Sequence, residues 1–101
     1  MPQFIITAHD FPDALPRRMA CRQKHLDMHA DLMKKGNMLY AAAMLNDRGE
    51  MAGSTIICEF PDRAALEAYL AAEPYIEGRV WDRVDVQPCK VAPLYTRNLA
   101  A

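Results

Sequence analysis

The sequence has little that would point to a membrane or nucleic-acid protein. It contains no apolar run of the roughly 20 residues that a membrane-spanning helix needs. Lysine and arginine number 12 against 13 aspartates and glutamates, so the formal net charge is -1, and no basic cluster stands out. Without a basic surface, nucleic-acid binding is a poor first hypothesis. Met1-Pro2-Gln3 leads into an apolar run without a basic stretch, so we expect no signal peptide.

Cysteine is also scarce. The three cysteines, Cys21, Cys58 and Cys89, are widely spaced, odd in number and form no C-x-x-C pair. This pattern argues against a disulfide framework and against a structural zinc site. Free thiols suit a reducing compartment, so we expect a cytoplasmic protein in which Cys58 at least is a small buried apolar residue. We predict no cofactor and no metal.

The sequence contains four short segments that are rich in β-branched and apolar residues. They predict strands over residues 4–9, 38–45, 51–60 and 79–87. The turn cluster 46–49 joins the second and third strands into a hairpin. The segment 38–45 is apolar throughout, so we expect it to be buried on both faces. In the last strand, alternation places Val80 with the other valines on one face and Trp81 on the opposite face.

Two helical segments separate these strands. Asp13 is the expected N-cap of the first, with Pro16 tolerated in its first turn, and Lys34-Lys35-Gly36 closes it. The second begins at its N-cap Asp62 and ends at Glu73-Pro74, and residues 74–78 could add a short turn. The apolar stripe expected to bury the first helix consists of Leu15, Met19, Leu26, Ala30 and Met33.

The predicted order β-α-β-β-α-β describes an α+β domain with the ferredoxin-like arrangement. In it, two helices cover one face of an antiparallel sheet. We predict a single domain over residues 1–101, of which 93–101 form a C-terminal tail. The other sheet face lacks a cover. Since large apolar patches are uncommon on monomers, we expect a homodimer.

Arg22 and His25 are the first candidates for chemistry. They are three residues apart on the first helix, so their side chains are neighbours. A half-buried histidine beside a fixed cation should have a lowered pKa, which favours the neutral imidazole that a general base needs. The alternative is a structural histidine on the flank of the helix. Glu73 is a second candidate, because a carboxylate at a helix C-terminus opposes the helix dipole.

A metal site is a further alternative. Cys21, His25 and His29 recur every four residues along the first helix, and H-x-x-x-H spacing occurs in zinc-binding helices. However, Leu26 stands where the H-E-x-x-H motif has its glutamate. Three ligands in line on one helix also cannot complete a tetrahedron alone. We therefore favour acid–base chemistry over a metal.

Three short motifs resemble those of one known family. Arg22-Gln23-Lys24-His25-Leu26 resembles the R-x-x-H-L signature of the YciI-like (YCII-related) family. Gly53-Ser54 resembles its Gly-Ser pair, and Glu73-Pro74-Tyr75 resembles its Asp-Pro-Tyr. The resemblance covers roughly residues 3 to 90. It implies a dimeric α/β barrel, in which the sheets of two subunits pack face to face around a His–Asp cleft.

The resemblance also implies roles for these residues. His25 would be the general acid or base, oriented by Glu73, while Arg22 would hold an anionic oxygen and Ser54 would hydrogen-bond the substrate. Tyr75 would lie at the cleft rim. The chemistry would be of the lyase or dehydrochlorinase type, acting on a small aromatic or anionic substrate.

Two other functions stay open. The family's aspartate is Glu73 in this chain, and this departure suggests a non-catalytic domain that binds a small ligand or assists a partner protein. A third hypothesis, from the wider barrel superfamily, is a cofactor-free monooxygenase or isomerase.

Overall fold

The computed structural model describes residues 1–96 and confirms the predicted order of strands and helices. The short turn expected at residues 74–78 forms a helix after the second long one, and a further short helix begins within the predicted tail 93–101, of which residues 97–101 lie outside the described part. The elements are β1 (Gln3–Asp10), α1 (Leu15–Lys34), β2 (Met38–Leu45), β3 (Met51–Glu59), α2 (Arg63–Ala72), α3 (Pro74–Glu77), β4 (Trp81–Cys89) and α4 (Pro93–Thr96).

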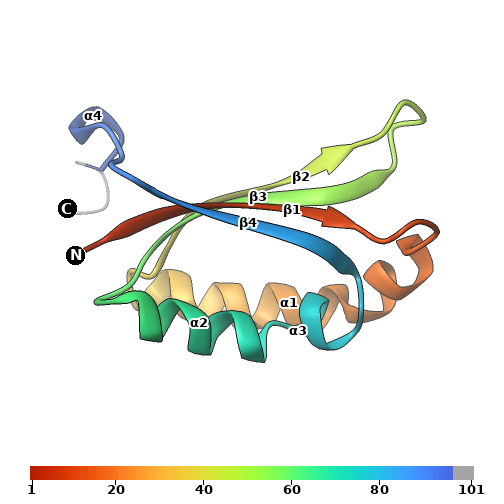
Figure 1. The fold of residues 1–101 in the computed structure, drawn as a ribbon, viewed down its shortest axis with the longest axis horizontal. Helices are drawn as coiled ribbons and strands as arrows, with labels where there is room; N and C mark the ends of the chain where they lie inside the picture. The colour runs from red at the N-terminus through yellow and green to blue at the C-terminus, as the bar shows by residue number, and fades with distance from the viewer. Residues whose placement is uncertain (97–101) are drawn as a thin grey trace.

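The sheet has the strand order β2-β3-β1-β4, and every neighbouring pair is antiparallel. Helices α1, α2 and α3 all cover one face of it, whereas α4 lies on the opposite side (Figure 1). The α+β, ferredoxin-like prediction is therefore confirmed. We call the sheet surface away from α1 and α2 the open face. It is concave between α4 and the β2–β3 hairpin (Figure 1).

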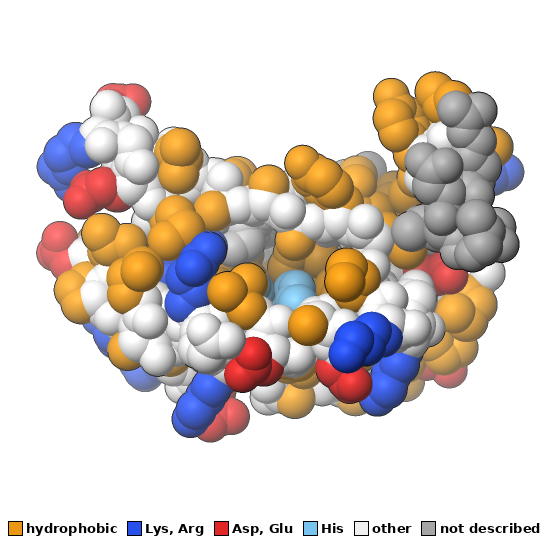
Figure 2. Space-filling view, turned by 180° about the vertical axis from the view of Figure 1, so that it is seen from behind, with side chains coloured by type: hydrophobic (Ala, Val, Ile, Leu, Met, Phe, Trp, Pro, Cys, Tyr) orange, Lys and Arg blue, Asp and Glu red, His pale blue; other side chains and the backbone are white. Residues whose placement is uncertain are grey.

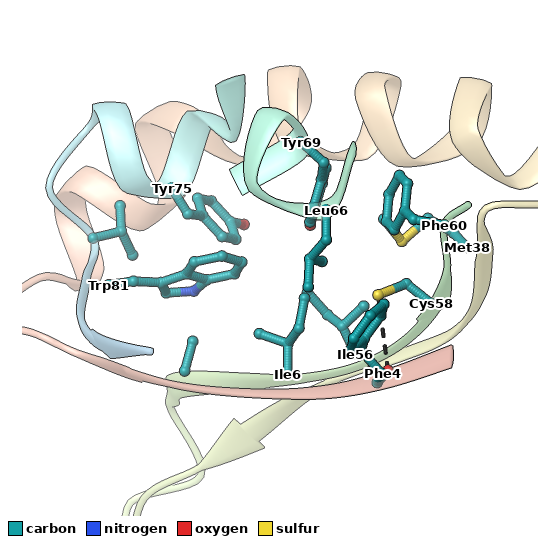
Figure 3. Packing of buried hydrophobic residues seen from close by; sticks show 12 residues of the cluster. Phe4, Ile6, Met38, Ile56, Cys58, Phe60, Leu66, Tyr69, Tyr75 and Trp81 are labelled. Carbon is teal, nitrogen blue, oxygen red and sulfur yellow. Dashed lines mark hydrogen bonds between the residues drawn. The ribbon is translucent and has the colours of Figure 1, made fainter. Parts of the chain in front are cut away.

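The core lies between the sheet and the three helices. Ile6, Ile56 and Leu66 are fully buried at its centre, and Tyr75 and Trp81 pack at one end (Figure 3). Cys58 is fully buried, as expected, and its thiol contacts the carbonyl of Phe4 at 3.8 Å. β1 and β3 pair in the middle of the sheet. Along each of these strands, side chains that point into the core alternate with side chains that point to the open face.

The helix ends were predicted in part. Asp62 caps α2 by accepting a hydrogen bond from the Ala65 N–H at 2.8 Å, and Gly36 has φ +86° just after α1. The Asp13 prediction is wrong, because Ala14 is the N-cap residue of α1 and no side chain caps it. Asp13 instead adopts φ 59°, a left-handed conformation that aspartate tolerates better than most residues.

The expected buried stripe of α1 is also wrong. Met19, Leu26 and Met33 are 52%, 41% and 63% exposed. The helix turns a different face inward, which includes the buried polar residues Arg18 and His25. Hydrogen bonds to other elements satisfy the two terminal nitrogens of Arg18 and Nδ1 of His25, and this makes their burial tolerable. Arg18 Nε is buried without a hydrogen-bond partner among the described residues.

Two strand predictions also need correction. In the single chain β2 is an edge strand, and Tyr40 is 65% exposed, so the expectation of burial on both faces is wrong here. The last strand begins at Trp81 rather than at residue 79, because Arg79 takes a left-handed φ of 57°. The register against β1 shifts between His9 and Asp10, and both Val80 and Trp81 are buried.

Candidate functional site

The site is built where α1, the start of β3 and the α2–α3 junction meet. Arg18 and His25 are seven residues apart, so they project from the same face of α1. Ser54 points inward from β3 and is buried. A Cβ atom on the preceding Gly53 would lie 2.6 Å from the Ala8 carbonyl oxygen, so only glycine fits beside Ser54 without a shift.

Glu73 occupies the junction between two helices. It ends α2 with φ -66° and ψ 122°, an extended conformation favoured before Pro74. The same residue is the N-cap of α3, and its side chain accepts a hydrogen bond from the Tyr75 N–H at 3.2 Å. Local chain geometry therefore directs this carboxylate back toward α1.

The Glu73 carboxylate is fully buried and accepts hydrogen bonds on both oxygens. Oε1 lies 2.7 Å from His25 Nδ1, and Oε2 lies 2.8 Å from both His29 Nε2 and the Tyr69 hydroxyl. Burial raises the pKa of Glu73, but the hydrogen bonds from His25, His29 and Tyr69 outweigh burial and lower it to about 2. The group is therefore a carboxylate at neutral pH.

His25 is held as a neutral base. Since Glu73 is ionised, His25 Nδ1 must carry the proton of their hydrogen bond, which leaves Nε2 unprotonated in the neutral ring. Burial lowers the pKa of His25, and the hydrogen bond to Glu73 offsets only part of this effect. The ring stacks on Tyr75, with centroids 4.0 Å apart and planes inclined by 11°.

His25 lines a cleft of about 170 Å³ between α1 and β2. A histidine side chain is visible at the base of the hollow surrounded by apolar side chains (Figure 2). The lining residues are Arg18, Arg22, His25, Leu26, Ala41, Ala42, Ala43, Met51, Ser54, Ile56 and Tyr75. The cleft thus joins an apolar wall from β2 to a polar wall from α1. A larger groove of about 750 Å³ near the N-terminus lacks a histidine–carboxylate pair, so we place the candidate site at the smaller cleft.

The structure brings the five predicted site residues together. Arg22, His25, Ser54 and Tyr75 line the cleft, and Glu73 lies directly behind His25. Arg22 is exposed and makes no hydrogen bond or ion pair within residues 1–96, so its guanidinium is available to an anion. Their proposed roles in binding and catalysis stay predictions.

Sequence reasoning missed a buried ion pair beside the cleft. Arg18 is 3% exposed and donates hydrogen bonds to the Asp10 carboxylate at 2.9 and 3.0 Å and to Ser54 Oγ at 2.9 Å. Trp81 Nε1 donates to the same hydroxyl at 3.3 Å, which leaves the Ser54 hydrogen free to donate. In the sequence, only the seven-residue spacing from Arg18 to His25 indicated that Arg18 lies on the same face of α1 as His25.

The metal alternative takes a different form in the structure. His25 and His29 group with Glu73 rather than with Cys21, and one ligand atom from each lies within 4.8 Å of the others. Those atoms are already joined by hydrogen bonds of 2.7 and 2.8 Å. An ion would have to displace the protons of both bonds.

Comparison with known proteins adds a family and confirms the fold. Residues 2–90 match the sequence profile of the YCII-related domain. Protein YciI of Escherichia coli O6:H1 is 36% identical over 93 residues, which cover 86% of this chain and 95% of that protein. No helix within residues 1–96 is both long enough and apolar enough to cross a membrane.

Several solved structures resemble the fold, including these two. One is the 5-chloro-2-hydroxyhydroquinone dehydrochlorinase of Burkholderia phenoliruptrix AC1100 in complex with 2,5-dihydroxybenzoquinone. Its TM-score is 0.79 at 21% identity, covering 89% of this chain and 95% of that one. The other is a dimeric ferredoxin-like protein from an uncultured marine organism. Its TM-score is 0.50 at 20% identity, covering 91% and 97%. At these identities the likeness establishes the fold.

Proposed function

Because the chain belongs to the YCII-related domain family, we propose that it is a small-molecule enzyme with His25 as its general base. The observation that carries this proposal is the 2.7 Å contact between His25 Nδ1 and Glu73 Oε1. It fixes the proton on Nδ1 and leaves a basic nitrogen in a ring that lines the cleft. A carboxylate that orients a histidine in this way is a recurring device of acid–base catalysis.

The cleft limits the class of substrate. A volume of about 170 Å³ is below the range of typical ligand pockets, whereas a cavity of roughly 150 Å³ can hold benzene. A single-ring compound therefore suits it better than a larger ligand. Arg22 at the rim, together with a free hydrogen on Ser54, favours a substrate that carries an anionic oxygen.

We infer an elimination reaction of the lyase type. His25 Nε2 takes a proton from the substrate. The electron pair of the broken bond to hydrogen forms a new double bond in the substrate, and the leaving group departs with the electron pair of the bond that held it. Arg22 stabilises the negative charge that develops on the substrate oxygen. The dehydrochlorinase with the similar fold supports this choice of chemistry, since its leaving group is chloride.

Chloride release tests the proposal. Purified protein would be incubated with chlorinated hydroquinols and the chloride measured by ion chromatography. His25→Gln should lower the rate about 10²–10⁴-fold, the range for loss of a general base. Lys24→Gln is the control, because Lys24 is exposed on α1 outside the cleft lining, and it should leave the rate unchanged.

Binding and oxygen uptake, measured with the same proteins and compounds, separate the other candidate functions. Binding of the ring compounds without turnover, weakened by the His25 substitution, would replace the enzyme proposal with the ligand-binding one. Oxygen uptake in place of chloride release would favour a monooxygenase. Chloride release at equal rates by wild type and His25→Gln would contradict the role of His25.

We also propose a homodimer that forms through the open face. Tyr40 pairs with Ile57 across β2 and β3 on this face, and both side chains border an apolar cavity of about 360 Å³. Sedimentation should give twice the chain mass of 11.4 kDa for the wild type. Ile57→Glu should shift the species toward monomer, whereas Lys24→Glu on exposed α1 should not. A monomeric wild type at high concentration would contradict this proposal.

A further inference from the structure

A second histidine, His29, lies beside His25 and contacts the other oxygen of the Glu73 carboxylate. His29 Nε2 lies 2.8 Å from Oε2, and the Tyr69 hydroxyl donates to the same oxygen at 2.8 Å. His29 and Tyr69 are only 9% and 5% exposed. Neither residue lines the cleft, so their polar groups serve the carboxylate and do not reach a bound ligand directly.

The proton positions on this side follow from the geometry. An ionised carboxylate only accepts, so a lone pair on His29 Nε2 facing it at 2.8 Å would be repelled. His29 Nε2 therefore carries a hydrogen, and both Glu73 Oε2 and the Tyr69 hydroxyl oxygen, each 2.8 Å away, can accept it. Burial raises the pKa of Tyr69, which keeps its hydroxyl protonated and able to donate as well.

The two donors restrict a flexible side chain. Burying a glutamate side chain in one conformation costs up to about 2 kcal/mol in lost rotamer freedom, and without contacts on both oxygens the carboxylate could rotate. His25 and His29 lie one turn apart on α1, with ring centroids 4.1 Å apart. Glu73 spans this separation with one oxygen on each ring.

We propose that His29, assisted by Tyr69, is a positioning residue that holds Glu73 so that its Oε1 keeps the proton of His25 on Nδ1. This inference rests on the proposed function of His25 and extends it to a residue outside the cleft. It explains how a glutamate can stand where the family resemblance places an aspartate. The longer side chain gains a second anchor, and that anchor is His29.

The competing explanation is that His29 simply fills space, since its ring packs against Tyr69 with centroids 5.6 Å apart. The two explanations differ in what a substitution must preserve. Positioning depends on an N–H donor at the place of Nε2. Packing depends only on volume.

Three substitutions of His29 distinguish the need for a hydrogen-bond donor from the need for side-chain volume. His29→Leu keeps apolar volume and removes the donor, and His29→Asn keeps an amide that is too short to reach Oε2. His29→Gln places an amide N–H near the position of Nε2. Lys24→Leu, on the exposed side of α1, is the matched control for introducing leucine. Far-ultraviolet circular dichroism would establish that each variant is folded.

The primary measurement is the tautomer of His25, read from ¹⁵N shifts of the imidazole nitrogens in long-range ¹H–¹⁵N spectra. We expect Nδ1–H to dominate in the wild type, in Lys24→Leu and in His29→Gln. We expect a substantial Nε2–H population in His29→Leu and His29→Asn. This readout needs no substrate, so it tests the positioning role even if the chain proves to have no turnover.

Kinetics give the second measurement where chloride release is found. His29→Leu and His29→Asn should lower kcat about 10–100-fold with KM little changed, as for other residues that orient a reacting group. His29→Gln should recover most of that loss. An unchanged tautomer in both loss variants, or a glutamine variant that behaves like leucine, would overturn the proposal.

Discussion

The buried ion pair between Arg18 and Asp10 makes the sharpest test of the energetics of this site. Their side chains are 3% and 5% exposed, and the shortest contact is 2.9 Å. Burial raises the pKa of Asp10 more than Arg18 lowers it, so the pair lies in the interior at a desolvation cost. Asp10→Leu would leave the Arg18 guanidinium buried without its counter-charge.

The size of the effect can be worked from this geometry. Opposite charges about 4 Å apart attract by about 4 kcal/mol at an effective dielectric constant near 20. We therefore expect Asp10→Leu to lower the free energy of unfolding by about 4 kcal/mol, within the ~3–5 kcal/mol found when one partner of a buried pair is removed. Arg18→Met should cost a similar amount. The double variant removes both charges and should lie within about 1–2 kcal/mol of the wild type.

Urea unfolding followed by tryptophan fluorescence would measure all four proteins. Trp81 is the single tryptophan, it is buried, and it donates a hydrogen bond to the same Ser54 hydroxyl that Arg18 contacts. The cycle should give a coupling energy of several kcal/mol. Single losses below about 1 kcal/mol, or a double variant whose loss equals the sum of the single losses, would refute the reasoning.

Three further predictions follow from the site and its support. Because burial lowers the pKa of His25, kcat/KM should fall on acidification only below pH 6.5, about tenfold per pH unit; a fall beginning above that pH would contradict a neutral His25 base. Gly78→Ala should lower the free energy of unfolding by about 1–3 kcal/mol, because a Cβ there would clash with Cys21 Sγ. Adding Cys21→Ala should restore part of the loss, and equal urea midpoints for Gly78→Ala and the wild type would contradict this. Burial raises the pKa of the Cys58 thiol to about 12, so a thiol reagent at pH 8 should modify at most two cysteines in the native protein and three in urea.

The parts of the fold that could be predicted depend on local chemistry. Asp62 was identified as a cap because its side chain bonds an N–H three residues away, and Gly36 because the left-handed turn after α1 favours glycine. Glu73 before Pro74 marked the end of α2 for the same kind of reason. Such interactions are encoded within a few residues of sequence.

The failures arise where distant segments meet. Trp81 turns inward because the register against β1 shifts beside Asp10, and no property of residues 79–87 reveals that shift. The face of α1 was misjudged because Arg18 and His29 look like surface residues until Asp10 and Glu73 are known to face them. A buried polar face gives no apolar periodicity to read.

The candidate site shows the same division. The family motifs located the five predicted residues, and the structure brings them together around His25. The motifs do not include His29 or Tyr69. His29 contacts Glu73 across 44 residues of sequence, and Tyr69 contacts it across four. The four-residue spacing from Tyr69 to Glu73 was a usable signal, but only once Glu73 was known to turn back toward α1.

The sequence separation of these contacts also bears on how the protein folds. His25 meets Glu73 across 48 residues, and Arg18 meets Ser54 across 36, so the site exists only after long loops have closed. Closing them costs chain entropy before any hydrogen bond of the site forms, which places the site late in folding. We therefore expect substitutions at His25 or Glu73 to speed unfolding while leaving the folding rate nearly unchanged. The histidine–carboxylate pair would then slow the unfolding of a domain whose sheet and helices form before the pair does.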